Sequence, residues 1–152
     1  YPDEFGVCDG SAELAPGVHV GQQTRMPFAL TYVTKIGNDV QSLDHGYKIH
    51  IIYGALAAPS EKNYQTINES PEAITFSWEV TTTPVDVPGF KPTAYLTIDS
   101  TAVDSEILKV IEDTLYGTES TEPELLMPAD IIDLINAGES SNGESSNPGE
   151  VD

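Results

Sequence analysis

The chain has 152 residues, about the length of one domain, and 39% of them are hydrophobic. It carries 25 Asp and Glu residues against 6 Lys and Arg residues, which gives a formal net charge of -19. Because phosphate binding depends on clustered Lys and Arg, this balance argues against tight binding of nucleic acid or of an anionic membrane surface. A single cysteine, Cys8, excludes an intrachain disulfide, and no apolar run approaches the roughly 20 residues that span a bilayer.

Alternation of hydrophobic and polar residues predicts four β-strands, over residues 28–36, 47–53, 74–81 and 94–98. One face of the first strand holds Phe28, Leu30, Tyr32 and Ile36, and one face of the second holds Tyr47, Ile49, Ile51 and Tyr53. The third strand places Ile74, Phe76, Trp78 and Val80 on one face, and the fourth places Leu96 and Ile98 together. β-Branched and aromatic residues dominate all four segments, as a half-buried pleated surface favours.

Turn-forming residues separate these strands, which predicts an antiparallel meander. The turns are Gly37-Asn38-Asp39, Asp44-His45-Gly46, Ala58-Pro59-Ser60 and Pro88-Gly89. Two connections, over residues 38–46 and 58–72, are longer than most hairpin loops.

After residue 100 the hydrophobic period changes from 2 to 3.6, which predicts a helix of about three turns. Thr101-Ala-Val-Asp104 resembles a capping box at its start, and Gly117 stands where a left-handed C-cap belongs. The apolar residues at helical spacing are Ile107, Leu108, Ile111 and Leu115. A shorter helix is predicted over residues 128–136 with Pro128 in its first turn, after an acidic link over 118–124.

The C-terminal third is the most acidic part of the chain. Residues 101–152 hold 13 carboxylates against one Lys, whereas residues 1–100 hold 12 against 5 basic residues. Near the end, Gly-Glu-Ser-Ser-Asn occurs twice in succession, over 138–142 and 143–147. Without aromatic residues this tail cannot offset the entropy of ordering it. We therefore predict one β domain over 1–136 and a disordered acidic tail over 137–152, whose repeat is more often a solubilising device than a binding tag.

The chain contains no recognised catalytic motif of the G-x-S-x-G, H-E-x-x-H, Walker or dinucleotide-binding type. Its three histidines lack the spacing and the Cys partner of a zinc site, and we expect His50 to be a surface or satisfied sheet residue. Asp39 and Asp44 suit turns better than a hard cation, which needs several convergent oxygen ligands. The sequence therefore predicts no enzyme, no cofactor and no metal site.

Two further possibilities stay open at the level of sequence. Paired carboxylates for glycoside hydrolysis depend on a spacing that only the fold decides. Trp78 with Tyr47, Tyr53 and Phe76 could form a sugar-stacking platform, although Phe76 and Trp78 share an inward face, which favours a core role. The alternative function is accordingly a monomeric β-sandwich binding module for carbohydrate or a cell surface.

Several ordered blocks of the sequence form a recognisable series. They include Tyr-Pro-Asp-Glu-Phe at the start, Gly-Tyr-Lys-Ile-His-Ile-Ile-Tyr-Gly over 46–54 and the run over 67–84, and the others lie at 8–14, 37–39, 58–62, 91–93, 98–101 and 115–117. In these blocks the chain, to about residue 135, resembles the major tail (tail tube) proteins of bacteriophages with long, non-contractile tails. Family members are similar in having a further region before the first block. Since the chain also lacks an initial Met, we expect it to be the C-terminal portion of such a protein.

The four alternating segments and the capped helix predict a mainly β fold, a β-sandwich or half-barrel of antiparallel strands with a flanking α-helix, or α+β by strict count. The resemblance implies a compatible fold, in which strands of neighbouring subunits join into a barrel that is flanked by a helix. It implies a structural protein of the virion whose hexameric rings stack, beside other tail proteins, around a lumen through which DNA passes. Such a protein assembles in the bacterial host cytoplasm, resides in the phage tail and contacts no membrane. An acidic lumen repels phosphates, which gives the net charge a role.

Candidate site residues follow from this implication. The long loops supply candidate contacts with a neighbouring subunit, namely Asn38, Asp39, Asp44, Tyr64 and Ile67. Glu79, on the polar face of its strand, is a candidate lumen-facing acid, although simple exposure to solvent explains it equally well.

Overall fold

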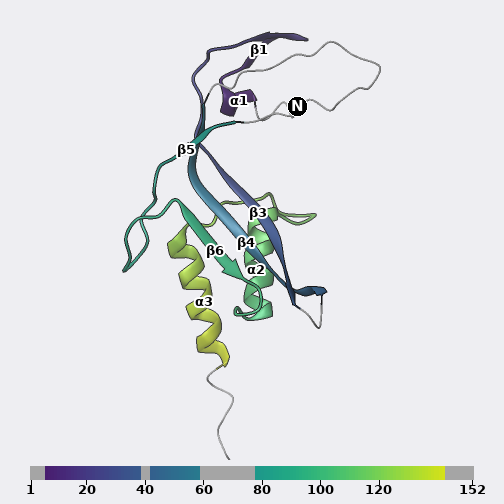
Figure 1. Ribbon diagram of the computed structural model, residues 1–152, viewed down its shortest axis with the longest axis vertical. Coiled ribbons are helices and arrows are strands. Elements are labelled where there is room, and N and C mark those ends of the chain that lie inside the picture. Colours follow the sequence, from purple (N-terminus) through teal and green to yellow (C-terminus); the bar gives the residue numbers. More distant parts are fainter. Residues whose placement is uncertain (1–5, 39–41, 59–77, 143–152) are drawn as a thin grey trace, which may run out of the picture. The chain divides into compact units, whose positions relative to one another are not determined.

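A computed structural model describes residues 6–38, 42–58 and 78–142 of the chain (Figure 1). These residues form antiparallel sheets and helices, and the predicted fold class, mainly β with a flanking helix, is confirmed. The described strands are β1 (Ala12–Ala15), β2 (Val18–Val20), β3 (Phe28–Asn38), β4 (Ser42–Ala57), β5 (Val80–Thr82) and β6 (Tyr95–Asp99). The described helices are α1 (Gly6–Asp9), α2 (Ser105–Tyr116) and α3 (Pro128–Asn142).

The chain divides into two compact units that share β3 and β4. One unit comprises Tyr1–Ala29 and Tyr53–Thr83, and the other comprises Leu30–Ile52 and Pro84–Asp152. In the second unit β4 lies between β3 and β6, and its register with β6 runs from Lys48 opposite Asp99 to Ile52 opposite Tyr95. In the first unit the end of β4 pairs with β5.

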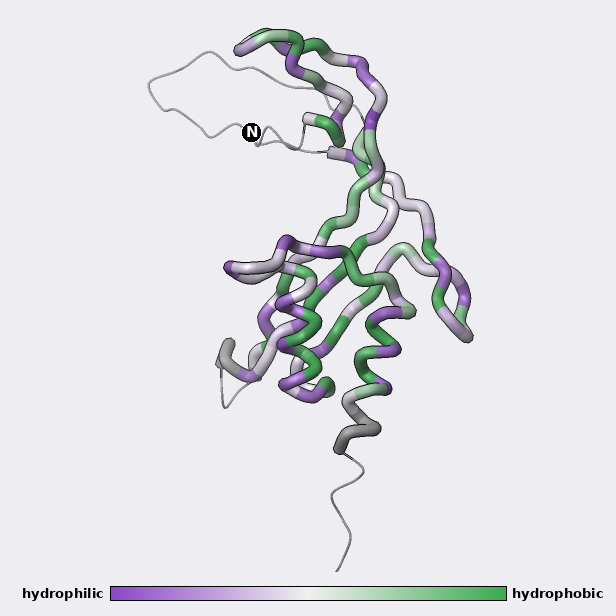
Figure 2. The backbone as a smooth tube through the Cα atoms, turned by 180° about the vertical axis from the view of Figure 1, so that it is seen from behind, coloured by the Kyte–Doolittle hydropathy of each residue, from purple (hydrophilic) through white to green (hydrophobic). Residues whose placement is uncertain are grey.

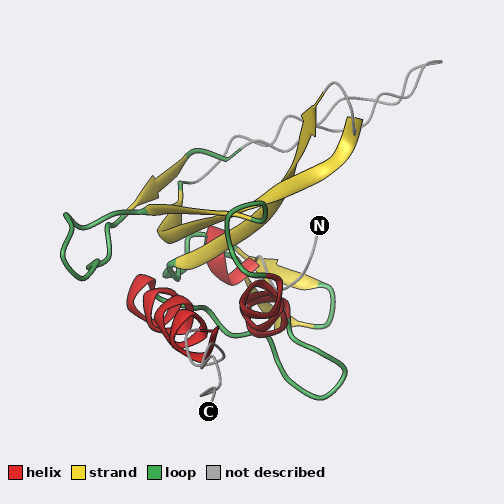
Figure 3. Ribbon diagram, turned by 90° about the horizontal axis from the view of Figure 1, so that it is seen from below, coloured by secondary structure: helices red, strands yellow, loops and turns green. Residues whose placement is uncertain are grey.

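The core of the second unit lies between one face of its sheet and the helices α2 and α3, which lie on the same side of that sheet (Figure 3). Ile49 and Ile51 of β4 and Ile111 of α2 have no exposed surface. Hydrophobic and hydrophilic residues are interleaved along α2 and along the coloured part of α3, as Figure 2 shows. The alternation predicted for residues 47–53 is confirmed, and burial of each large side chain stabilises the fold by about 1.5–3 kcal/mol.

The first predicted strand is confirmed as β3, but its apolar face points away from the helices. Val33 and Lys35 line a pocket together with residues of α2, so Leu30 and Tyr32 lie on the opposite face of the sheet. Leu30 is 47% exposed and Tyr32 is 41% exposed. The hydrophobic period identified the strand but not the side of it that packs on the helices.

Described residues of two predicted turns are strand in the structure. β3 continues through Asn38, and residues 44–46 lie within β4. At Gly46 the lack of a side chain allows a close approach, because a Cβ there would lie 2.5 Å from Cγ2 of Thr101. Gly46 therefore serves strand packing and not a turn. The predicted 38–46 loop is wrong at residues 38 and 42–46, and residues 39–41 lie outside the described residues.

The other predicted turns have different outcomes. At Pro88-Gly89 the turn is confirmed, since Gly89 has a φ of 78° and the amide of Phe90 donates to the carbonyl of Val87 at 3.1 Å. The turn at 58–60 lies outside the described residues beyond Ala58.

The predicted third strand lies mostly outside the described residues, which resume at Trp78. Its described end differs from the prediction, because β5 begins at Val80 and Glu79 precedes it. The alternation predicts an inward-facing Val80, but its side chain is 43% exposed. By contrast, the fourth strand is confirmed as β6, with Ile98 buried and Leu96 half-buried on one face.

The first unit contains elements that the sequence did not predict. They are the short helix α1 and the antiparallel hairpin of β1 and β2, which turns at Gly17 with a φ of 77°. Every residue of β1 is exposed, and its Ala-Glu-Leu-Ala sequence has no β-branched residue. Neither the burial alternation nor the composition that usually marks a strand is therefore present.

The first predicted helix is confirmed as α2, although its cap is not the one predicted. Asp104 is the N-cap, and its side chain accepts a hydrogen bond from the amide of Glu106 at 2.8 Å. Thr101 instead donates its hydroxyl to Asp99 at 2.7 Å, in the turn that precedes the helix. Gly117 is the C-cap as predicted and has a positive φ of 74°, but its ψ of 175° lies outside the left-handed helical region.

The second predicted helix is confirmed with a different end. α3 starts at Pro128 but runs to Asn142, so its last residues belong to the segment that the sequence assigned to a disordered tail. Gly138 explains part of this extension, because it allows α3 to lie against Ile107 of α2, where a Cβ would meet Cδ1 at 2.1 Å. Residues 143–152 lie outside the described residues.

Asp104→Ala is expected to lower the free energy of unfolding by about 1 kcal/mol, because the amide of Glu106 loses its acceptor. Asp104→Asn is the matched control, since asparagine caps helices as well as aspartate does. Urea denaturation followed by circular dichroism measures both variants. Equal stability of the Ala and Asn variants would contradict the capping role.

Candidate functional site

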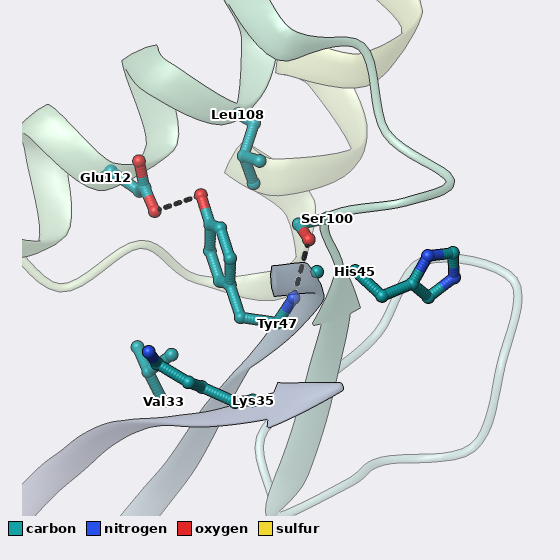
Figure 4. A pocket seen from close by; sticks show the side chains of 8 residues that line it. Val33, Lys35, His45, Tyr47, Ser100, Leu108 and Glu112 are labelled. Atoms are coloured by element: carbon teal, nitrogen blue, oxygen red, sulfur yellow. Dashed lines mark hydrogen bonds between the residues drawn. The ribbon is translucent and has the colours of Figure 1, made fainter. Parts of the chain in front are cut away.

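A pocket of about 690 Å³ lies within the second unit, where the β3–β4 hairpin meets α2 (Figure 4). Four segments contribute to it, and all of them belong to the same unit. Its lining consists of Val33, Lys35, His45, Gly46, Tyr47, Ser100, Leu108 and Glu112. The pocket therefore combines two apolar side chains with groups of both charges.

Tyr47 connects three of these segments. Its hydroxyl donates to Oε1 of Glu112 on α2 at 2.7 Å, and its amide donates to Oγ of Ser100 at 2.9 Å (Figure 4). The amide of Ser100 in turn donates to the carbonyl of Tyr47 at 3.0 Å. Ionising the phenol would place a second negative charge beside Glu112, so this hydrogen bond, helped by burial, raises the pKa of Tyr47 to about 12.

The charges of the pocket differ in their surroundings. Lys35 is exposed on β3 and has no carboxylate partner among the described residues. Glu112 is half-buried and already accepts the hydroxyl of Tyr47. The pocket can therefore hold a small polar group, with a cation on the strand side and a carboxylate on the helix side.

The opposite face of the same sheet carries a row of stacked rings. Tyr32, His50 and Tyr95 lie on the adjacent strands β3, β4 and β6, with ring centroids 4.5 Å apart for the first pair and 5.9 Å for the second. Nδ1 of His50 lies 2.6 Å from the hydroxyl of Tyr95, and Nε2 lies 2.7 Å from that of Thr34. His50 is 9% exposed, so the prediction of a satisfied sheet histidine is confirmed.

Of the five candidate subunit-contact residues, the structure places Asn38 and Asp44. Asn38 ends β3 and Asp44 lies within β4, so neither belongs to a long loop. Asp39, Tyr64 and Ile67 lie outside the described residues. Asp44 is therefore not a turn residue as predicted, and Asp39 stays outside the described residues.

Glu79 is exposed, as a lumen-facing acid requires, but it precedes β5 and does not belong to the polar face of a described strand. Its carbonyl accepts the amide of Ala58 at 2.7 Å. The sugar-stacking platform is contradicted at Tyr53, which has no exposed surface, and Phe76 lies outside the described residues.

Sequence patterns missed both the Tyr47–Glu112 pair and the ring row. Each depends on which residues face one another across strands or between strand and helix, and one chain's alternation does not contain that register. The alternation did place Tyr47 and His50 on opposite faces of one strand, which is the part of the arrangement that a period of 2 determines.

Some kinds of site receive no support from the described part of the chain. There, His, Cys, Asp and Glu do not gather in groups of three that could hold a metal ion. Along residues 6–38, 42–58 and 78–142, none of the helices has the length and hydropathy to cross a membrane.

The chain matches no protein-family model, no curated protein and no solved structure.

Tyr47 is expected to stay protonated at about pH 11, where an ordinary tyrosine is mostly ionised. Because the pKa in the folded state lies above the unfolded value of 10.0, the stabilisation is complete below pH 10.0 and is lost as the pH rises toward about 12. NMR titration of ring-labelled tyrosine, assigned with Tyr47→Phe, measures this.

Glu112→Ala is expected to return the pKa of Tyr47 toward its ordinary value, since the hydrogen bond to Glu112 is the largest cause of the shift. Glu106→Ala is the control, because it removes an acid from the same helix without touching Tyr47. If both variants left the titration of Tyr47 unchanged, the carboxylate contact would be wrong.

Proposed function

We propose that this protein is a structural subunit of a bacteriophage tail tube. Its copies form hexameric rings that stack, with other tail proteins, around a lumen that DNA traverses. The protein is assembled in the bacterial cytoplasm and resides in the virion. It performs no catalysis and takes no cofactor.

One observation carries this proposal: the ordered blocks that resemble tail tube proteins along residues 1 to about 135. No one block is chemically diagnostic, so the resemblance is carried by their number and order. The antiparallel sheet with flanking helices agrees with the fold that the resemblance implies.

The charge of the chain supports the same proposal. A conduit for DNA must not bind phosphates, and a formal net charge of -19 repels them. In the described part of the chain, Lys48 and Lys109 are each paired with an aspartate, at 3.6 Å and 2.6 Å. Cations available to DNA are therefore fewer than the composition alone suggests, and exposed acids such as Glu79 suit a lumen surface.

The decisive experiment is negative-stain electron microscopy of the protein purified in its full natural length. Rings or tubes are expected as protein concentration and salt increase, because salt screens the repulsion between acidic subunits. Small monodisperse particles at every concentration and ionic strength would contradict the proposal.

A monomeric binding module is the second candidate function, and the pocket beside Tyr47 favours it. Its polar lining and apolar walls are typical of a small-ligand site. A glycan array probes this alternative, and the tail-tube proposal expects no saturable binding. Binding that Lys35→Ala abolishes, without a change in stability, would favour the binding module instead.

A further inference from the structure

The face of the second unit's sheet opposite α2 and α3 is here called the outer sheet face. Its tyrosine side chains are exposed but are held in place by contacts with His50. It includes Leu30, Tyr32 and Thr34 of β3, Lys48, His50 and Ile52 of β4, and Tyr95, Thr97 and Asp99 of β6. The register of β4 with β6 places Ile49 opposite Ile98 and Ile51 opposite Leu96 on the helix side. Alternation then places the residues between them on the outer side.

Three large side chains of this face remain open to solvent. Leu30 is 47% exposed, Tyr32 is 41% exposed and Tyr95 is 50% exposed. Exposed apolar side chains that occur singly need no explanation, but here Tyr32 and Tyr95 belong to one ring row across three neighbouring strands, and Leu30 lies on the same face of β3 as Tyr32. A continuous surface of this kind is typical of an interface.

The two tyrosines are already fixed in the unbound chain. Tyr32 stacks on His50 with an interplanar angle of 9°, and the hydroxyl of Tyr95 lies 2.6 Å from Nδ1 of the same ring. Thr34 holds the other ring nitrogen at 2.7 Å. Association therefore costs little side-chain entropy at these positions, and tyrosine is among the residues that contribute most to binding energy at interfaces.

The electrostatics of the outer sheet face favour a particular partner. Among the side chains that the structure describes, its charged residues are Lys48 and Asp99, which pair with one another at 3.6 Å. Two copies of a chain with net charge -19 repel one another wherever acids meet, but the described side chains of this face include no unpaired acid. A basic partner would need carboxylates, and a nucleic acid would need Lys and Arg, so neither suits this face.

We propose that the outer sheet face is where a second copy of this chain binds, with Leu30, Tyr32 and Tyr95 buried in the contact. This inference rests on the proposed function, which requires copies of the chain to associate. It assigns the face a contact role and not a lumen role, since a lumen lining that repels DNA needs carboxylates.

Sedimentation velocity of the full chain over a range of concentrations tests the contact. Wild-type protein is expected to associate, and more strongly as salt increases, because the described charges of the contact pair with one another while the rest of the surface repels. Leu30→Glu places an acid in the contact and is expected to weaken association about tenfold or more. Val110→Glu on α2 is the matched control, since Val110 is 48% exposed and lies on the helix side.

Thr97→Glu is a second test variant, which keeps the contact testable if Leu30→Glu does not fold. Thr97 is exposed on β6, and its side chain makes no hydrogen bond among the described residues, so the substitution leaves the core unchanged. Circular dichroism is expected to match the wild type while association falls. Monomeric wild-type protein at all concentrations, or equal association of wild type, Leu30→Glu and Thr97→Glu, would overturn the contact. Equal weakening by Val110→Glu would do so as well, since added charge alone would then explain the effect.

Microscopy of the same variants separates this inference from the proposed function. If Leu30→Glu and Thr97→Glu form rings as the wild type does, the function stands and the outer sheet face is not the contact. If these variants lose an association that never produces rings, the contact stands and the tube proposal fails. Glycan binding that Leu30→Glu abolishes, with self-association unchanged, would overturn the inference in favour of a carbohydrate surface.

Discussion

The described structure depends on the pairing of β4 with three other strands. This strand hydrogen-bonds to β3 and β6 in one unit and to β5 in the other, and its buried side chains Ile49, Ile51 and Tyr53 contribute to the core. Because successive side chains of a strand point to opposite faces, the same backbone also presents His50 to the other side. One strand therefore contributes both to the buried core and to the outer sheet face.

Tyr47 and His50 lie on opposite faces of β4 and make different kinds of contact. On the helix side Tyr47 holds α2 through Glu112 and the β6–α2 connection through Ser100. On the outer side His50 holds Tyr32 and Tyr95 in a fixed stack. The polar groups on one side fix the helix, and those on the other keep aromatic surface ordered while it is exposed.

Acidity and self-association are opposing demands in a tail tube, and the distribution of charge offers a way to meet both. A net charge of -19 suits a conduit for DNA but opposes contact between copies. On the outer sheet face, where we propose that copies meet, the described charges pair with one another in one ion pair. The pocket beside Tyr47 differs, since Lys35 and Glu112 make it polar and better suited to a small ligand.

The sequence by itself determined the fold class, three of the four predicted strands and both long helices, because periods of 2 and 3.6 are local properties of the chain. It did not determine that residues 44–46 are strand, since the close approach of Thr101 to Gly46 brings together distant segments. The cap at Asp104 and the outward direction of Leu30 and Tyr32 were decided in the same way. Only the tertiary structure joined Tyr47 to Glu112 and His50 to Tyr95, because register between strands and contact between strand and helix depend on long-range packing.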